Sequence, residues 1–201
     1  MTPKVRRLLW LSAFVLWTTG VAVGLHILWS YENAPGPAAD APSQWPADVR
    51  IPRPNGRPIL IVALHPQCPC SRATIAELAR LTARAATPPE VHTLFVAAPG
   101  FDEALIHSDL WDAAAAIPGV QVMRDEGTEA RRFGARVSGQ VLAYDGEGHL
   151  RFSGGITGSR GHEGDNAGRA AIEAMLAGRP HAASAFVFGC FLFDGDGHVA
   201  I

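Results

Sequence analysis

The sequence predicts a three-layer α/β/α sandwich preceded by one transmembrane helix. Three observations point to this architecture: a long uncharged run near the N-terminus, an alternation of short apolar strands with amphipathic helical segments after residue 58, and two final strands joined by a tight turn. The chain has 201 residues, of which 48% are hydrophobic, so its length fits one ordinary domain and an appendage. A formal net charge of −2 excludes the basic surface of a nucleic-acid-binding protein. Three cysteines are also too few for a small scaffold held together by disulfides.

The uncharged run predicts a membrane anchor. Residues 8–29 contain no Asp, Glu, Lys or Arg, and as a helix they would span roughly 33 Å, enough to cross the core of a bilayer. Lys4, Arg6 and Arg7 precede the run, which predicts a cytoplasmic N-terminus and an exported remainder. A signal peptide cleaved after Ala39-Asp40-Ala41 is the competing interpretation. The run is longer than the usual signal-peptide core of about 7–15 residues, which favours an uncleaved anchor.

Composition divides the chain into four parts: the anchor at 1–31, a Pro-rich linker at 32–57, an α/β domain at 58–180 and a C-terminal extension at 181–201. The prolines of the linker exclude a helix or a central strand. We expect this segment to be extended and to hold the domain off the bilayer. The domain has an ordinary single-domain size.

The elements of the domain follow from the apolar pattern. Ile59–Leu64 is a continuous apolar run of the kind that a buried central strand shows. A helix is expected at 70–85, with Glu77, Arg80 and Arg84 off its apolar face. The remaining expected elements are strand 91–97, helix 108–117, strand 120–123, a short helix at 126–133, strands 140–144 and 149–152, and helix 166–177. Helices between the first strands require a parallel centre, and the turn at 145–148 predicts a terminal antiparallel hairpin.

The segment from His65 to Arg72 carries the chemistry, because it joins the first strand to the first helix of the domain, at the sheet edge where ligands bind. Pro69 suits a first helical position and makes Cys68 the N-cap residue, facing free N–H groups and the positive end of the helix dipole. That placement lowers a thiol pKa, so Cys68 is the predicted attacking thiolate and Cys70 the resolving thiol. The mechanism requires an accessible Cys68 sulfur. Burial of both sulfurs beneath packed side chains would contradict it.

These residues resemble the thioredoxin-like superfamily, and specifically the membrane-tethered extracytoplasmic thioredoxins of the TlpA and ResA type. The RedB-like proteins are more similar still, through the HPxCPCSR start, a GGITxSRGHEGDN loop and a late VFGC. The superfamily resemblance covers roughly Pro58 to Gly178, and the RedB-like one extends to Cys190. It implies a thiol-disulfide oxidoreductase on the periplasmic side of a bacterial inner membrane, without a cofactor, acting in cell redox homeostasis. Its partners would be exported protein thiols or disulfides and a membrane or periplasmic electron donor.

The chain departs from the family pattern at three places. The family has a Thr-Pro with a cis peptide before the hairpin, and Ser138-Gly139 stands there in this chain. Gly adopts unusual backbone conformations without being locked in them, and we expect partners to dock against the Ser138 backbone. The pair is Cys-Pro-Cys instead of Cys-x-x-Cys; the smaller ring predicts a strained, comparatively oxidising couple. His65-Pro66-Gln67 replaces the aromatic that precedes the first family cysteine.

Several candidates have two interpretations. Cys190 is either a core thiol or a third redox-active thiol that pairs with Cys68 or Cys70. His65 either tunes Cys68 or packs beside a proline. A second group lies in the Gly-rich loop at 153–166: Arg160, His162 and Glu163 form a polar rim beside the thiols if the loop folds back, and a solvated linker otherwise.

A copper site is the alternative from another functional class. Cys68, Cys70 and Cys190 offer soft ligands that suit Cu(I), which would make the protein a copper-binding assembly factor or metallochaperone. A scaffold that only binds partners is a third hypothesis. The similar stretches 145–149 and 194–198 are too short for an EF-hand and predict turns.

Overall fold

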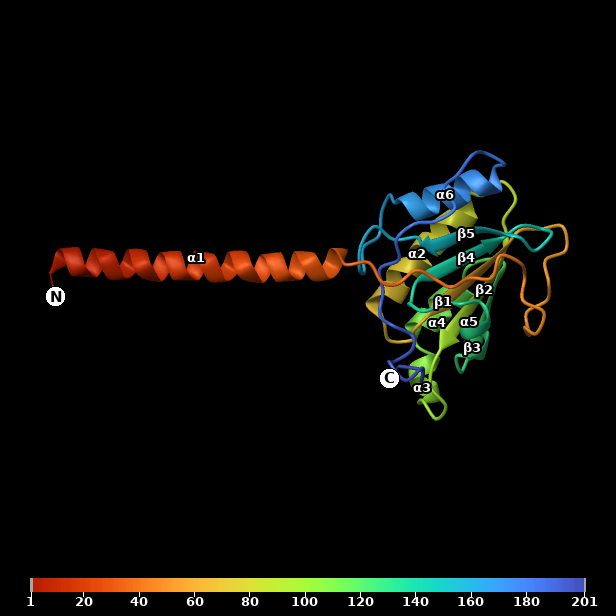
Figure 1. The fold of residues 1–201 in the computed structure, drawn as a ribbon, viewed down its shortest axis with the longest axis horizontal. Helices are drawn as coiled ribbons and strands as arrows, with labels where there is room; N and C mark the ends of the chain where they lie inside the picture. Colours follow the sequence, from red (N-terminus) through yellow and green to blue (C-terminus); the bar gives the residue numbers. More distant parts are fainter. Residues whose placement is uncertain (1, 201) are drawn as a thin grey trace. The chain divides into compact units, whose positions relative to one another are not determined.

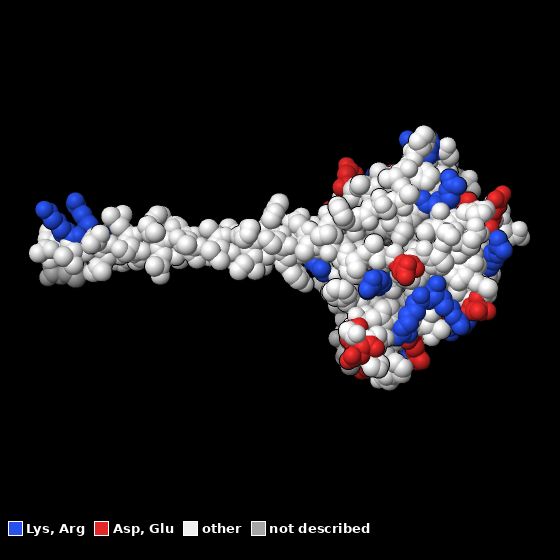
Figure 2. All heavy atoms as spheres, in the orientation of Figure 1, with Lys and Arg blue, Asp and Glu red and all other residues white. Residues whose placement is uncertain are grey.

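The computed structural model describes residues 2–200 and contains two compact units that divide after Ala34. The first unit is a single helix, α1 (Pro3–Asn33). It is long and apolar enough to cross a membrane, and its surface is almost free of charge away from its basic N-terminal end (Figure 2). The expected apolar helix is therefore present, whereas its orientation stays a prediction.

The second unit is built on a five-stranded sheet in the order β3-β2-β1-β4-β5 (Figure 1). The strands are β1 (Ile59–Leu64), β2 (Glu90–Val96), β3 (Val120–Asp125), β4 (Gln140–Tyr144) and β5 (Leu150–Gly155). Strands β1, β2 and β3 are parallel, while β4 runs antiparallel to β1 and pairs with β5 as a hairpin. This is a thioredoxin-like arrangement, and it confirms the predicted parallel centre with an antiparallel edge.

One face of the sheet is covered by helices. The helices of this unit are α2 (Pro69–Arg84), α3 (Glu103–Ile106), α4 (Asp109–Ala115), α5 (Thr128–Arg132) and α6 (Ala167–Leu176). The even positions of β1 pack in one core cluster with apolar side chains of α2, α3, α4 and α6. The alternation of side chains along a strand sends the odd positions to the other face. The helices therefore form one complete layer, and β1 lies fully buried at the centre.

The opposite face has less helical cover. Among the described residues, only the short helix α5 packs there, and segments without regular structure complete the layer. Trp45 and Ile51 come from the N-terminal side of the domain, and Leu192 and Val199 from the C-terminal side; all four are buried. Two chain ends thus supply the apolar surface that a longer helix would otherwise bring.

The Pro-rich segment differs from the expected free spacer. Residues 35–57 contain no helix, as their prolines indicate, but they belong to the same compact unit as the sheet. The ring of Trp45 lies edge-on to Phe133 and Tyr144, with centroids 5.0 and 5.1 Å away. The Tyr144 hydroxyl donates to the carbonyl oxygen of Pro42 (3.1 Å). These contacts hold the segment against the sheet, because burying the aromatic rings outweighs the freedom of an extended chain.

Candidate redox site

Cys68 lies between the end of β1 and the start of α2. It is the N-cap residue of α2, with extended backbone (φ −91°, ψ 125°) and a proline in the first turn. Its N–H donates to the carbonyl oxygen of His65 (3.2 Å), and its own carbonyl accepts from the N–H of Ser71 (2.9 Å). The N-cap position predicted from Pro69 is confirmed.

The three cysteines are free thiols with very different exposure. Cys68 is 3% exposed and Cys70 is 2% exposed, whereas Cys190 is exposed. The expectation that a partner touches Cys68 directly is wrong, because both early sulfurs are covered. The cover over Cys68 includes Cys190 itself: the two Sγ atoms lie 3.4 Å apart. The exposed cysteine of the site therefore belongs to the C-terminal extension.

The pKa values of the three thiols are shifted in opposite directions. Hydrogen bonds from the thiols of Cys190 and Cys70 hold the pKa of Cys68 far below its ordinary value and outweigh the opposing effect of burial. The same hydrogen bonds, together with burial, raise the pKa of Cys70 and of Cys190. Of the three thiols, Cys68 is therefore the one whose surroundings favour the charged form. The direction of its shift agrees with the sequence prediction, but the largest causes are the other two cysteines.

His65 borders this cluster. Burial lowers its pKa, and the nearby Cys68 charge opposes that effect. Its Nδ1 accepts from the N–H of Gln67 (3.3 Å), and its ring lies edge-on to Phe101, with centroids 6.2 Å apart. His65 is therefore neutral at neutral pH and acts on Cys68 as a polar neighbour that also packs. Cys68 further borders a groove of about 350 Å³ between α2 and α4.

Ser138 and Gly139 form the wall behind the cysteines. The Ser138 hydroxyl lies 2.8 Å from the hydroxyl of Ser71 and accepts from the N–H of His65 (3.0 Å). The N–H of Gly139 donates to the carbonyl oxygen of Ala63 (2.8 Å), and its φ is +89°. No peptide bond among the described residues is cis. A left-handed glycine thus stands where the family has its proline. Ser71, which sequence reasoning missed, ties this wall to α2.

The C-terminal extension pairs with the segment that leads into β4. The N–H of Ser138 donates to the carbonyl oxygen of Cys190 (2.8 Å), and the N–H of Leu192 donates to that of Arg136 (2.9 Å). Val137 and Phe191 form an antiparallel bridge between these two hydrogen bonds. Cys190 is therefore held by main-chain pairing at the edge where a partner was expected to dock.

The Gly-rich loop folds back toward the cysteines at two of its residues. The guanidinium of Arg160 donates to the carbonyl oxygen of Gly189 (2.5 Å), directly before Cys190. The backbone of Gly161 hydrogen-bonds Cys70. His162 is exposed and its Nδ1 contacts the carbonyl oxygen of Arg160 (2.8 Å), while Glu163 pairs with an arginine on α2. Of the predicted rim, Arg160 supports the site and the other two residues lie farther along the loop.

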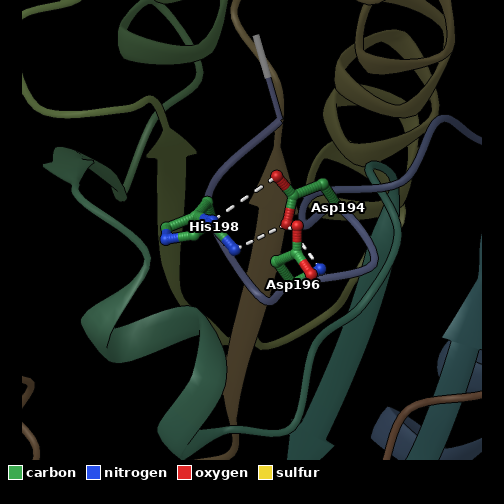
Figure 3. A group of neighbouring side chains, drawn as sticks. All are labelled: Asp194, Asp196 and His198. Carbon is green, nitrogen blue, oxygen red and sulfur yellow. Dashed lines mark hydrogen bonds and ion pairs between the residues drawn. The ribbon is translucent and has the colours of Figure 1, made fainter.

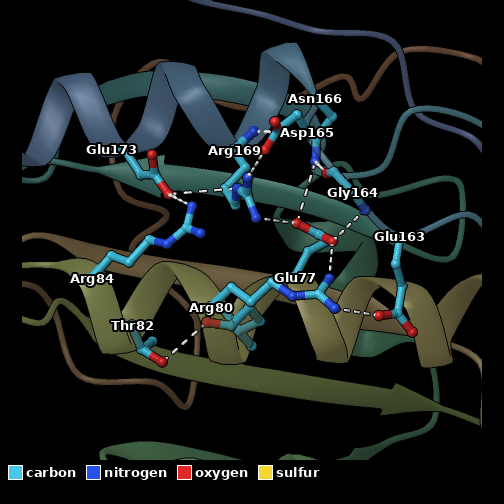
Figure 4. Close-up of polar contacts among 11 residues, drawn as sticks. Glu77, Arg80, Thr82, Arg84, Glu163, Gly164, Asp165, Asn166, Arg169 and Glu173 are labelled. Carbon is cyan, nitrogen blue, oxygen red and sulfur yellow. Dashed lines mark hydrogen bonds and ion pairs between the residues drawn. The ribbon is translucent and has the colours of Figure 1, made fainter.

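A buried carboxylate fixes the rest of that loop. Glu77, on α2, is fully buried and pairs with Arg169 of α6 at 2.7 Å and with Arg80 (Figure 4). It also accepts from the N–H of Gly164 (2.8 Å). Glu77 lies outside the apolar cluster of α2, as expected, but it is buried, because Arg169 and the loop bring charge and N–H donors over that side of the helix. The sequence offered one sign of this cluster: charged residues, among them Asp165 and Arg169, stand close to Gly164.

The second group of polar ligands is a surface turn. The carboxylate of Asp194 accepts from the N–H groups of Asp196 (3.0 Å) and His198 (2.8 Å), as predicted for residues 194–198 (Figure 3). Within residues 2–200, a metal ion could be held by three or more His, Cys, Asp or Glu side chains only at this exposed turn, where the ligand atoms all lie within 4.8 Å of one another. The three cysteine sulfurs do not form such a group. Copper binding stays a prediction from the residue types.

Comparisons with known proteins show the fold and no family. No family model and no curated protein matches the chain. Among solved structures, a hypothetical protein from Sinorhizobium meliloti is 17% identical, with TM-score 0.60 over 78% of this chain and 97% of that one. An uncharacterized conserved protein from Geobacillus kaustophilus is also 17% identical, with TM-score 0.57 over 79% and 91%. An exposed lipoprotein thioredoxin from Streptococcus pneumoniae is 19% identical over 62% and 86%, and its TM-score of 0.43 is too low to carry an argument.

Proposed function

We propose that this protein is a thiol-disulfide oxidoreductase whose central sulfur is Cys68. Because the burial of both early sulfurs contradicts direct attack by Cys68 on a partner, the proposal is that exchange reaches Cys68 through a neighbouring sulfur. The observation that carries the proposal is the position of Cys68 at the N-cap of α2, with the Cys190 sulfur 3.4 Å from its own; the lowered pKa of Cys68 agrees with it. A bond between two sulfurs is about 2.05 Å long, so a small movement joins them.

The electrostatics favour an oxidising couple. A thiolate that is stabilised in the reduced form makes the reduced protein more stable, and the disulfide is then the stronger oxidant. It also makes Cys68 a good leaving group, since thiols of lower pKa leave faster. The direction of net electron flow that we propose is therefore from partner thiols to the protein.

We also propose a compartment for the redox domain. A disulfide persists in exported compartments and is reduced in the cytosol. Helix α1 is long and apolar enough to anchor the chain, and basic residues precede it. We place the redox domain on the extracytoplasmic side, where exported proteins are its partners. We propose further that it acts as the membrane-tethered thioredoxins of the TlpA, ResA and RedB-like type do, which its sequence motifs resemble.

The test uses Cys68→Ser in the full chain, with Thr87→Ser, on an exposed turn after α2, as a handling control. We expect Cys68→Ser to abolish exchange with glutathione disulfide and with insulin, and Thr87→Ser to leave it unchanged. We also expect ultraviolet thiolate absorbance to persist as the pH falls below the ordinary thiol pKa of about 8.5, because the pKa of Cys68 is lowered. The absorbance should vanish in Cys68→Ser. Full exchange activity in that variant would refute the proposal.

A further inference from the structure

We infer that the working disulfide joins Cys68 to Cys190, and that partners exchange with the Cys190 sulfur, which the C-terminal extension holds where a partner's own cysteine would dock. The inference rests on the proposed function and deepens it. It assigns the catalytic contact with the partner to a residue about 120 positions away from the Cys-Pro-Cys pair.

The first support is the way the extension is docked. Residues 190–192 pair antiparallel with residues 136–138, through hydrogen bonds of 2.8 and 2.9 Å and the bridge between Val137 and Phe191. Adding a strand to an open edge is a general way in which peptides bind, with main-chain hydrogen bonds for affinity and side chains for specificity. The side chain that the extension presents in this position is a cysteine, 3.4 Å from the Cys68 sulfur.

The second support is a close fit between backbones. A Cβ atom at Gly189 would overlap the carbonyl oxygen of Ser138. Farther back, a Cβ at Gly155 would lie 2.8 Å from the carbonyl oxygen of Phe186, to which the Gly155 N–H donates at 3.2 Å. At both contacts the backbones can approach this closely only because one partner is a glycine: Gly189 of the extension in the first and Gly155 of β5 in the second. Arg160 adds a charged donor to the Gly189 carbonyl.

The third support is the division of exposure and protonation among the sulfurs. Cys70 is 2% exposed, and its raised pKa keeps it a thiol that donates to Cys68. Cys190 is exposed, so a partner reaches it without displacing any element. Cys68 lies beneath it and receives the charge when the disulfide opens. The arrangement assigns stabilisation of the thiolate to Cys70 and contact with the partner to Cys190.

The exchange step balances with two partner thiols. A partner thiolate attacks the Cys190 sulfur, a bond between the partner and Cys190 forms, the bond between Cys190 and Cys68 breaks, and the electron pair stays on Cys68. A second thiolate of the same partner then attacks the partner sulfur and releases Cys190, which takes up a proton. The partner is oxidised to a disulfide, and the protein is reduced to one thiolate and one thiol.

The primary experiment maps the disulfide. The full chain is oxidised with glutathione disulfide, digested without reduction and analysed by mass spectrometry. We expect Cys68 joined to Cys190 and free Cys70. A disulfide between Cys68 and Cys70 would overturn the inference and leave the proposed function in place.

The kinetic experiment compares Cys190→Ser with the unchanged chain and with Cys68→Ser, with glutathione as the thiol. We expect Cys190→Ser to slow thiol oxidation by more than about a hundredfold, because removing one member of a unit that acts together costs nearly as much as removing all of it. When Cys68→Ser is treated with glutathione disulfide, the mixed disulfide should form on Cys190, with reduced glutathione as the leaving thiol. If Cys190→Ser kept full activity while Cys68→Ser lost it, partners would reach Cys68 through the neighbouring groove and the inference would fail alone.

A second variant moves Cys190 without removing it. Gly189→Ala forces the extension away from Ser138, so we expect a loss of exchange rate and of Cys68–Cys190 disulfide. Gly195→Ala is the matched control, because a Cβ there meets nothing within 4 Å and its φ is not positive. Equal rates for the two alanine variants would contradict the inference, and melting curves check that both fold.

Discussion

Gly139 sets the backbone behind the cysteines through its own conformation. Its φ of +89° lies in the region that side chains with a Cβ rarely adopt, and its N–H donates to the carbonyl oxygen of Ala63. A Cβ at this position would lie 2.8 Å from the hydroxyl oxygen of Thr74, which is buried and has no hydrogen-bond partner among the described residues. Both backbone and space therefore require glycine here.

We expect Gly139→Ala to lower the free energy of unfolding by at least about 1–2 kcal/mol, the cost of left-handed backbone for a residue with a Cβ. The overlap with Thr74 adds to that cost. Gly158→Ala is the control, because its φ is not positive and its Cβ would have open space. Urea unfolding of both variants measures the difference. Equal stabilities would show that the wall behind the cysteines yields to a methyl group.

The sequence allowed the position of each early site residue to be predicted, but not its surroundings. Pro69 and the apolar strand before it are local signals, and they located Cys68 at the N-cap correctly. The exposure of Cys68 and the burial of Glu77 depend on segments far away in the chain, Cys190 in one case and Arg169 in the other. Such contacts leave no periodicity in a single sequence, so the predicted access to Cys68 was wrong and the burial of Glu77 could not be predicted.

At the scale of elements, the link between α2, α6 and the Gly-rich loop depends on one buried carboxylate. Glu77 pairs with Arg169, which is 6% exposed, and accepts from the loop at Gly164. The same loop continues to Arg160 and Gly161, which support Cys190 and Cys70. Loss of the carboxylate would therefore loosen the site from a distance.

We expect Glu77→Ala to destabilise the protein by about 3 kcal/mol, because it removes the one fully buried carboxylate that pairs with Arg169 and leaves that guanidinium only the more exposed Asp165 and Glu173. Glu163→Ala removes a partly exposed partner of Arg80 and should change the melting temperature little. Calorimetry of the two variants compares them directly. A small effect of Glu77→Ala would mean that water replaces the lost carboxylate.

Long elements with a strong pattern were predicted closely, and short or irregular ones were not. The predicted strands at 59–64 and 140–144 agree with β1 and β4 at both ends. Helix α3 was missed because four residues carry no periodicity; the Asp102 side chain, which accepts from the N–H of Ala104 (2.9 Å), was the available signal. Strand β5 continues to Gly155 because β4 supplies a partner for its glycines, a contact that local propensity does not describe.

At the scale of the whole molecule, the two units differ in what covers their apolar surface. Helix α1 has no buried side chain and exposes large apolar residues throughout, as a helix made for lipid would. In the second unit, residues 35–57 and the C-terminal extension cover one face of the sheet. Within the described residues, the compact unit is therefore 35–200, longer at both ends than the α/β domain predicted at 58–180.

We expect Trp45→Ala to lower the free energy of unfolding by about 3–5 kcal/mol, because it empties the space against Phe133 and Tyr144. Trp17→Ala, at a 65% exposed position of α1, is the control and should leave the unfolding of the domain unchanged. Denaturant titration of the two variants in detergent provides the comparison. If Trp45→Ala had no effect, the Pro-rich segment would be a loose spacer after all.

The cover that Cys190 provides also bears on chemical damage. Thiolates that face solvent are the cysteines most readily driven by peroxide to sulfinic and sulfonic acids, from which most proteins do not recover. Here Cys68, whose pKa is lowered, is 3% exposed, and the pKa of the exposed Cys190 is raised by its hydrogen bond to Cys68 and by burial. The lowered pKa and the exposure that together favour attack by peroxide are therefore divided between two cysteines.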